Sequence, residues 1–291
     1  MAKPTLVINI RPTGQEAIKP SELIQITGHH SLGLASRRMI TILWHSAHQQ
    51  GIEENKDYRI PLSDLRSDGH HGSEQIRETI RALMTTLIEV RDHQGNTETT
   101  VQILGGNDMF KKDRAEGVLT YSFDKRLIWI LKDSAIWGKI SMPVLMAFST
   151  KYAVSLYENV AQRFNLEYKH TETFTIEEFR RVLGVEEGKY GSFGELNKHV
   201  IRRALDEVSA LAPFNIQIQP IKTGKRVTHL VLGWWGKTEE EMKAAYQELA
   251  RPRVGRRSRI EGTTEKVVPT TRVEEQLRKE RVIRKRLPNP S

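Results

Sequence analysis

One segment of the sequence, residues 192–211, combines a helical apolar pattern with polar side chains suited to contacting a ligand. Its apolar residues recur at the spacing of one buried helix face, so the polar residues between them face outward. Arginine, lysine, histidine and serine on such a face can hydrogen-bond to base edges in the major groove of DNA. The outward candidates are Ser192, Lys198, His199, Arg202 and Arg203.

Further cations flank this segment. Lys189 precedes it, and a predicted hairpin of two strands, residues 214–221 and 227–234, follows it. The hairpin tip holds three cations and no acid, namely Lys222, Lys225 and Arg226. Cations beside a base-reading helix are placed to contact phosphates. The pattern therefore favours a double-stranded DNA site, although an ordinary solvated helix face would show the same alternation of charge.

A second polar helix face is expected at residues 73–87, where a serine can cap the first turn. This face is less cationic, because Glu74 and Glu78 lie among its arginines and opposite charges at such spacings form intrahelical pairs. Two interpretations stay open for it: contacts to the DNA backbone, or a structural or dimerising role. Together with the loop expected at 105–117, the DNA-binding candidates here are Ser73, Gln75, Arg77, Arg81, Lys111 and Lys112.

Segments that resemble catalytic or metal-binding motifs each lack a residue that the motif requires. Residues 184–189 have three residues between their glycines instead of four, and Tyr190 stands where a phosphate loop needs serine or threonine. His45 and His48 have helical ligand spacing, but no third ligand follows them. The sequence contains no nucleophile elbow, no clustered acidic metal site and no His-apolar-His motif of a rolling-circle nickase. We expect a protein that is not an enzyme and needs no cofactor.

The composition narrows the class of protein. The chain has 291 residues, of which 38% are hydrophobic and 28% charged, which suits roughly two domains. It has no cysteine, so disulfide scaffolds and cysteine-ligated zinc fingers are excluded. No apolar run reaches the ~18 residues of a membrane span, and residues 1–10 lack the apolar core of a signal peptide. We expect a cytoplasmic protein without a membrane partner.

Positive charge is concentrated at the C-terminal end. The net charge is +9, and residues 237–291 hold 15 Lys and Arg against 9 Asp and Glu. A basic tail on a mildly basic body favours a polyanionic partner. Its cations suit salt-dependent attraction to phosphates, or they only keep a disordered tail soluble.

The expected elements occur twice in one order: helix, short strand, two helices and a hairpin, which is the order of a winged helix. The first set comprises a helix at 34–49, a strand at 58–62, helices at 62–66 and 73–87, and strands at 88–92, 99–104 and 119–131. The second set comprises a helix at 143–164, an extended piece at 173–175, a helix at 176–183 with Thr175 as its cap, the 192–211 helix and its hairpin.

We therefore predict an α+β chain of two tandem winged-helix (helix-turn-helix) domains with a basic, partly disordered C-terminal tail. The predicted parts are a mobile N-terminal arm (1–28, with a possible strand at 6–10), winged-helix domain 1 (29–140), winged-helix domain 2 (141–236) and the basic tail (237–291). Within the tail we expect a short helix at 237–251, a flexible Pro/Gly/Arg-rich stretch at 251–259 and a charged helix at 272–287.

Many positions of the second domain match a known family in the right order. They include SLYE at 155–158, FTIEEF at 174–179, LGV at 183–185, Tyr190, Phe193, Leu196, Val200, Ile201, Ala204, Glu207, Val208 and GKRV at 224–227. Trp137 and Leu145 match the junction of that family's two halves. On these residues the chain resembles the iteron-binding Rep family of theta-type plasmid replication initiators. The resemblance is strong over 141–235, looser over 31–131 and absent from the tail.

The resemblance implies two winged helices related by a pseudo-twofold axis. Monomers of such initiators bind origin direct repeats (iterons), help to open an AT-rich segment, and recruit the host initiator and helicase. Homodimers often repress the initiator's own promoter at an inverted repeat. The C-terminal winged helix typically makes most base contacts, which implies base reading by Lys198 and Arg202. Gly194 and Glu195 depart from the family, which often has basic or polar residues there.

Two other interpretations stay open. A winged-helix transcription regulator without a role in replication would bind only at promoters. A scaffold whose winged helices bind other proteins would show no salt-sensitive affinity for DNA.

Overall fold

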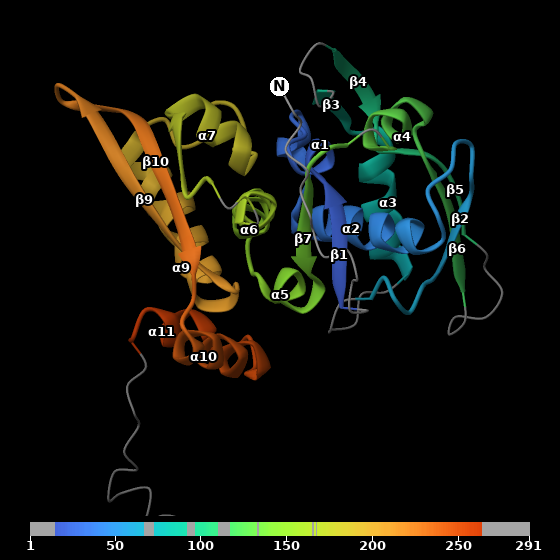
Figure 1. The fold of residues 1–291 in the computed structure, drawn as a ribbon. Helices are drawn as coiled ribbons and strands as arrows, with labels where there is room; N and C mark the ends of the chain where they lie inside the picture. The colour runs from blue at the N-terminus through green and yellow to red at the C-terminus, as the bar shows by residue number, and fades with distance from the viewer. Residues whose placement is uncertain are drawn as a thin grey trace, which may run out of the picture. The chain divides into compact units, whose positions relative to one another are not determined.

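The computed structural model describes residues 15–66, 73–91, 97–109, 117–132, 134–164, 166 and 168–263. The chain divides into two units, Met1–Arg251 and Pro252–Ser291. The first unit contains two hydrophobic cores, one built from residues between Leu23 and Leu131 and one built mainly from residues between Ile140 and Trp234. The elements of the first unit are drawn in Figure 1.

The first core is enclosed by four helices and two small sheets. The helices are α1 (Ser21–Ile24), α2 (Leu34–Gln49), α3 (Ser73–Thr85) and α4 (Lys125–Lys132). One sheet has the order β2 (Tyr58–Pro61), β6 (Val118–Phe123), β5 (Leu104–Met109), and the other is the hairpin of β3 (Leu87–Arg91) and β4 (Glu98–Gln102). Trp44 of α2 is fully buried in this core and donates through Nε1 to the Ile18 carbonyl at 2.7 Å. The expected helix at 34–49 and the expected hairpin are confirmed. The helix expected at 73–87 is present as α3 but ends at Thr85, and Leu87 is instead an exposed residue of β3.

Three expectations for this region are wrong. Residues 62–65 form a turn instead of a helix, and β5 occupies the start of the segment expected to be a loop. The segment expected as one strand at 119–131 is β6 followed by α4. Asp124 causes the change, because its carboxylate accepts from the amide of Arg126 at 2.8 Å and so caps the start of α4.

The N-terminal segment is also unlike the expected mobile arm from residue 15 onward. Strand β1 (Glu16–Pro20) pairs antiparallel with β7 (Trp137–Ser141), with Ala17 opposite Ile140. Ala17 and Ile24 are buried in the second core. A partner more than 100 residues away in sequence thus orders this segment. The strand expected at 6–10 lies outside the described residues.

The second core is enclosed by the second winged helix. Its elements are α5 (Met142–Ala147), α6 (Lys151–Phe164), β8 (Thr171–Thr175), α7 (Ile176–Leu183), α8 (Phe193–Leu196), the π-turn η2 (Asn197–Ile201), α9 (Arg202–Leu211), β9 (Phe214–Thr223) and β10 (Arg226–Gly236). The strands form one antiparallel sheet in the order β8-β10-β9. Thr175 caps α7 in a capping box with Glu178, as expected.

One helix that the sequence predicts in this region is divided into α5 and α6 in the structure. The predicted helix at 143–164 breaks at Phe148, whose backbone is extended. Its buried ring packs on Tyr157, with ring centroids 5.2 Å apart. The Glu207 carboxylate accepts hydrogen bonds from the backbone amide and the hydroxyl of Ser149, the first of these at 2.6 Å. Glu207, which is 58 residues away from Ser149 in sequence, thus stabilises the break between α5 and α6. The periodicity of residues along α5 and α6 does not reveal such a distant partner.

Helix α2 joins the two cores through consecutive arginines. Arg37 donates to the hydroxyl of Ser155 in α6 and, at 3.4 Å, to the carbonyl of Leu183. Arg38 donates to the carbonyls at the end of α5, including that of Met146 at 2.8 Å. Burial lowers the pKa of Arg37 to about 10, so it stays charged at neutral pH. Figure 1 shows α6 between α7 and β7, and α6 packs against both of them.

The expected basic tail begins later than residue 237. Helix α10 (Glu239–Ala250), which matches the short helix expected there, is capped by Thr238 and packs against α9 and α5, with Ala245 buried. In the second unit, α11 (Arg256–Ile260) replaces part of the expected flexible stretch, because Arg259 donates to the Val254 and Pro252 carbonyls at 2.9 and 2.7 Å. The helix expected at 272–287 lies outside the described residues.

Candidate nucleic-acid interface

The expected reading helix is present over its full length as α8, η2 and α9. Ser192 is its N-cap: its hydroxyl accepts from the amide of Glu195 at 3.2 Å, and the Glu195 carboxylate accepts in return from the Ser192 amide at 3.5 Å. This capping box satisfies backbone donors that the first turn leaves unpaired. Ser192 thus has a structural role in addition to the base contact expected of it, and Glu195, which departs from the resembled family, serves this cap.

Three cations occupy the outward face of the helix. Lys198, Arg202 and Arg203 are exposed, while Val200 and Ile201 between them are buried. None of the three forms an ion pair with another described side chain. An exposed surface with three cations that form no ion pairs within that part of the protein suits a polyanionic partner.

His199 has a different environment from these cations. It is half-buried, and its ring stacks on Tyr190 with centroids 5.8 Å apart and an interplanar angle of 18°. Tyr190 itself has a left-handed backbone, with φ 54°, which is uncommon for a residue other than glycine. The base contact expected of His199 stays a prediction, and the stack gives its ring a packing role.

Arg180 holds the turn that carries Tyr190. From α7 it donates to the Tyr190 carbonyl at 3.0 Å and also to the Lys189 carbonyl. Arg180 was not among the residues predicted from the sequence, because nothing in the local pattern of α7 indicates contacts with carbonyls about ten residues away. Arg180 and the Tyr190–His199 stack together connect both helices of the helix-turn-helix.

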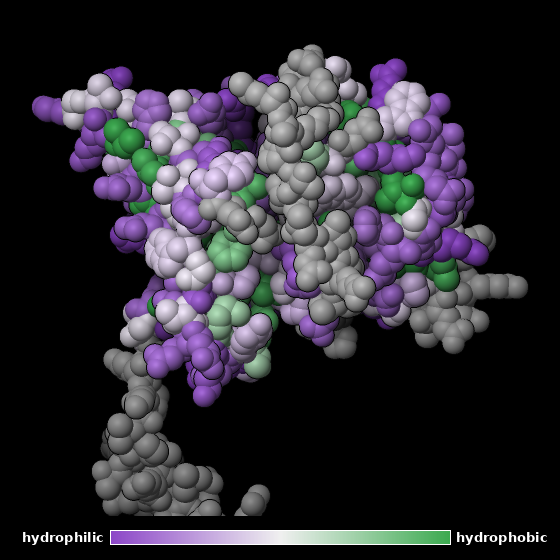
Figure 2. All heavy atoms as spheres, in the orientation of Figure 1, coloured by the Kyte–Doolittle hydropathy of each residue, from purple (hydrophilic) through white to green (hydrophobic). Residues whose placement is uncertain are grey.

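The hairpin β9–β10 is the expected wing. Its tip carries Lys222, Lys225 and Arg226, all exposed and without an ion pair to a described side chain. Gly224 has φ +62° and so permits the tight turn. The hairpin projects from its domain in Figure 1, and Figure 2 shows mostly hydrophilic residues around its tip. This end of domain 2 therefore presents cations both on a helix and on a wing.

Lys189 differs from the wing cations because it has an acidic partner. Its ammonium lies 2.6 Å from Glu186, whose carboxylate also contacts Lys151 at 3.3 Å. The hydrogen bond and charge of Glu186 raise the pKa of Lys189. The expected phosphate contact of Lys189 would have to compete with this local pair.

Helix α3 of domain 1 carries both acidic and basic side chains on its polar face, as expected from its sequence. Gln75 and Arg81 are exposed, and Arg77 lies 3.9 Å from Glu74 in an intrahelical ion pair. The expected pairing of opposite charges is thus confirmed for this pair. The side chain of Ser73, and both Lys111 and Lys112, lie outside the described residues.

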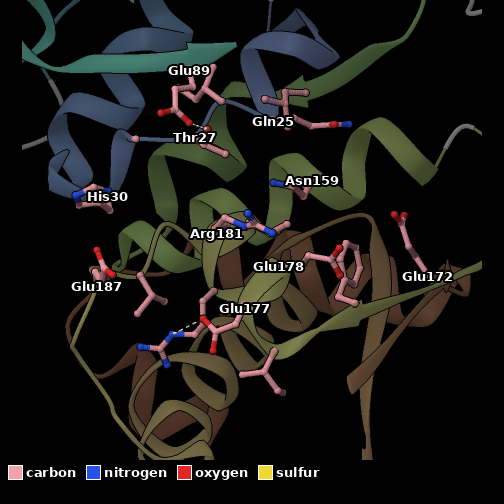
Figure 3. A pocket seen from close by; sticks show the side chains of 18 of the residues that line it. Gln25, Thr27, His30, Glu89, Asn159, Glu172, Glu177, Glu178, Arg181 and Glu187 are labelled. Carbon is pink, nitrogen blue, oxygen red and sulfur yellow. Dashed lines mark hydrogen bonds and ion pairs between the residues drawn. The ribbon is translucent and has the colours of Figure 1, made fainter. Parts of the chain in front are cut away.

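A cavity of about 1130 Å³ lies between the two winged helices, beside α7 and the start of the reading helix. Figure 3 shows its walls, which are lined by side chains of both signs. Several of its carboxylates already have partners, since Glu89 accepts from Thr27 at 3.0 Å and Glu172 lies 2.5 Å from Arg163. The first contact links the segment after α1 to β3, and the second links α6 to β8.

The described residues contain neither a cluster of potential metal ligands nor a membrane-spanning helix. No group of three or more His, Cys, Asp or Glu side chains is arranged there to hold a metal ion. Among the described helices, none has both the length and the apolar character needed to cross a membrane.

Comparison with known proteins places the chain in a family. The family model described as "Initiator Replication protein, WH1" matches residues 16–161, and the one described as "Initiator Rep protein, WH2" matches residues 175–234. No curated protein sequence is a significant match. A solved structure of the Pi initiator protein in complex with iteron DNA has a similar fold, with a TM-score of 0.57 and 14% identity over 78% of this chain and 100% of that chain. The chain therefore belongs to the Rep family of replication initiator proteins, with a WH1 and a WH2 domain.

Proposed function

We propose that this protein is a plasmid replication initiator that binds double-stranded DNA at direct repeats of its origin. On binding, it would promote opening of an AT-rich segment and recruit the host initiator and helicase in the bacterial cytoplasm. A homodimer would repress the protein's own gene at an inverted repeat. These steps require binding and deformation of DNA but no bond chemistry from the protein.

One observation carries the proposal. The WH2 domain presents Lys198, Arg202 and Arg203 on the outward face of its reading helix, and three further cations lie at the tip of the adjacent wing. A recognition helix supplies base contacts and a wing supplies phosphate contacts, which together give specificity and affinity. Family membership and the similar fold of an initiator bound to iteron DNA support the proposal that this surface binds DNA.

A DNase footprint of the purified chain on DNA flanking its own gene tests the proposal. The assay uses physiological salt and excess competitor DNA, because phosphate attraction alone gives non-specific binding. Regularly spaced protection over direct repeats is the expected result. Protection of a single inverted repeat at the promoter would instead indicate a repressor, and absence of specific protection would reject the proposal.

A transformation assay separates initiation from promoter binding. A plasmid that carries only the protected repeats and the adjacent AT-rich segment is introduced into cells that supply the protein in trans. Replication of this plasmid is expected only when the protein is present. Specific binding without replication would leave a transcription regulator as the function.

A further inference from the structure

The reading helix contains one widened turn. Between α8 and α9, residues Asn197–Ile201 form a π-turn, and the amide of Arg202 donates to the carbonyl of Asn197, five residues before it. A regular α-helix would bond this amide to the carbonyl four residues before it. A π-turn therefore accommodates one extra residue, and such turns are frequent at functional sites.

Burial explains why the extra residue is accommodated at this point. Seven residues make about two turns of a regular α-helix, so Asn197 would share the face of Ala204, which is fully buried. A buried amide without a partner is costly. With the π-turn, Leu196 takes that place in the core and is fully buried, while Asn197 is only half-buried.

The same turn changes the outward face. It rotates Lys198 away from the side of Ile201, which is buried, and toward the side of Arg202 and Arg203, which are exposed. We propose that the π-turn at Asn197–Ile201 determines DNA sequence specificity by gathering Lys198, Arg202 and Arg203 into one contiguous reading surface. Asn197 is then a positioning residue, because it favours the turn without itself reading a base.

The position of His199 agrees with this arrangement. His199 follows Lys198 directly, and its ring is engaged by Tyr190 in the preceding turn of the chain. Tyr190 is in turn held through its carbonyl by Arg180. The His199 side chain is thus fixed against the turn that joins the two helices of the helix-turn-helix. This contact stabilises the π-turn in which His199 lies.

The proposal rests on the proposed function, and deletion of Asn197 tests it. The deletion places Leu196 seven residues before Ala204, so the core is kept while the helix becomes regular. The full-length chain and the variant are each used to select preferred sequences from a random duplex library, and folding is compared by circular dichroism and thermal melting. We expect the variant to fold and to select a different base at one or more positions, with affinity for the original site lowered about tenfold or more.

A double-mutant cycle in the intact chain keeps the proposal testable if the deletion variant does not fold. Lys198→Ala and Arg203→Ala are measured singly and together by titration of the selected site. If the two cations share one reading surface, their combined loss of affinity differs from the product of the single losses by about threefold or more. Lys198 and the wing residue Lys225 form the control pair, for which independent effects are expected.

The outcomes separate this proposal from the function on which it rests. A wild-type chain that selects no sequence would reject the proposed function. A wild-type chain with a clear preference, matched by a folded deletion variant with the same preference and affinity, would overturn the role of the π-turn alone. Independence of Lys198 and Arg203 would overturn it as well.

Discussion

Lys19 and Glu158 form a buried ion pair in which Nζ and Oε1 are 2.8 Å apart, and both side chains are less than 10% exposed. Thr41 of α2 donates to the same carboxylate oxygen at 2.8 Å. The pair thus ties β1 and α2 to α6, where the two hydrophobic cores meet. These contacts lie at the junction of the WH1 and WH2 domains, so in the proposed function they would determine the spacing between the two domains.

Removal of one partner of this pair should destabilise the protein strongly. Glu158→Ala leaves the Lys19 ammonium buried without its counter-charge, which costs about 3–5 kcal/mol of unfolding free energy. The double variant Lys19→Met, Glu158→Leu should recover most of that loss, because it removes both charges from the interior. Urea denaturation measures both effects. Equal stability of Glu158→Ala and the wild type would show that the pair contributes little.

Gly184 should tolerate no side chain. It has φ +63°, and a Cβ at this position would collide with the guanidinium of Arg37. Gly184→Ala therefore combines the left-handed backbone cost of about 1–2 kcal/mol with a steric clash at the domain junction. Gly188→Ala is the matched control, because Gly188 has φ +78° with open space around it. Thermal melting should rank Gly184→Ala well below Gly188→Ala, and equal melting temperatures would contradict the clash.

Base-reading and phosphate-binding cations should differ in their effects on DNA binding. Arg202→Ala should cost ~1–3 kcal/mol at the specific site and relax sequence preference. Lys225→Ala should weaken binding about equally on all sequences and reduce the salt slope by about 1. Lys243→Ala, an exposed position on α10, is the control. Titrations at several salt concentrations check these outcomes, and an unchanged sequence preference in Arg202→Ala would argue against base reading.

The C-terminal residues should contribute phosphate contacts that do not depend on sequence. A chain truncated after Gly262 keeps α10 and α11 and loses the remaining basic segment. It should fold normally, bind all sequences more weakly, and show a flatter salt dependence, by about 0.9 per lost phosphate contact. An unaltered salt slope would show that the segment does not touch phosphate. Truncation after Gly236 is a poorer test, because it also removes α10 from its packing on α9.

Stability should fall as the pH is lowered through the range in which free histidines become protonated. Burial, together with the nearby charge of Arg37, lowers the pKa of His29 well below its usual 6.5. The unfolded chain then binds a proton that the folded chain does not, so unfolding free energy decreases as the pH falls below about 6.5. Burial also lowers the pKa of His45 and His48, which adds to the effect.

Replacement of His29 by glutamine isolates its share of this pH dependence. Urea denaturation at a series of pH values between 7.5 and 5 should give a shallower loss of stability for His29→Gln than for the wild type. Parallel curves for the two proteins would show that His29 does not take part in the pH dependence.

Elements with strong local signals were predictable from the sequence. Thr175, with Glu178 three residues later, caps the start of helix α7, and Gly184 follows the last residue of the helix with the left-handed backbone typical of a helix end. The wing hairpin was predictable because two β-like runs flank a Gly-Lys turn. In each case the residues that determine the element lie within it, so neighbouring positions suffice to predict it.

Elements that depend on distant partners were not predictable in this way. Strand β1 is ordered by β7, and the break after α5 is held by Glu207 of α9. Periodicity and propensity report on neighbours in sequence, whereas both features are decided by residues that only folding brings close. Helix α4 is a different case, because its apolar residues fit a strand as well as a helix, but Asp124, which caps it, lies directly before it in sequence.

The same contrast between local signals and distant partners applies to the residues of the candidate site. The family was recognisable in the sequence from many matching residues in the right order. The cations of the reading helix and wing were predictable as well, because residue type and helical spacing show which side chains face outward. The stack of His199 on Tyr190 and the π-turn that reorients Lys198 were visible only in the folded chain. Both depend on packing between segments, since a buried face must exclude the amide of Asn197 and a turn must find partners for its carbonyls. The pairing of Lys189 is local by contrast, because Glu186 lies only three residues before it.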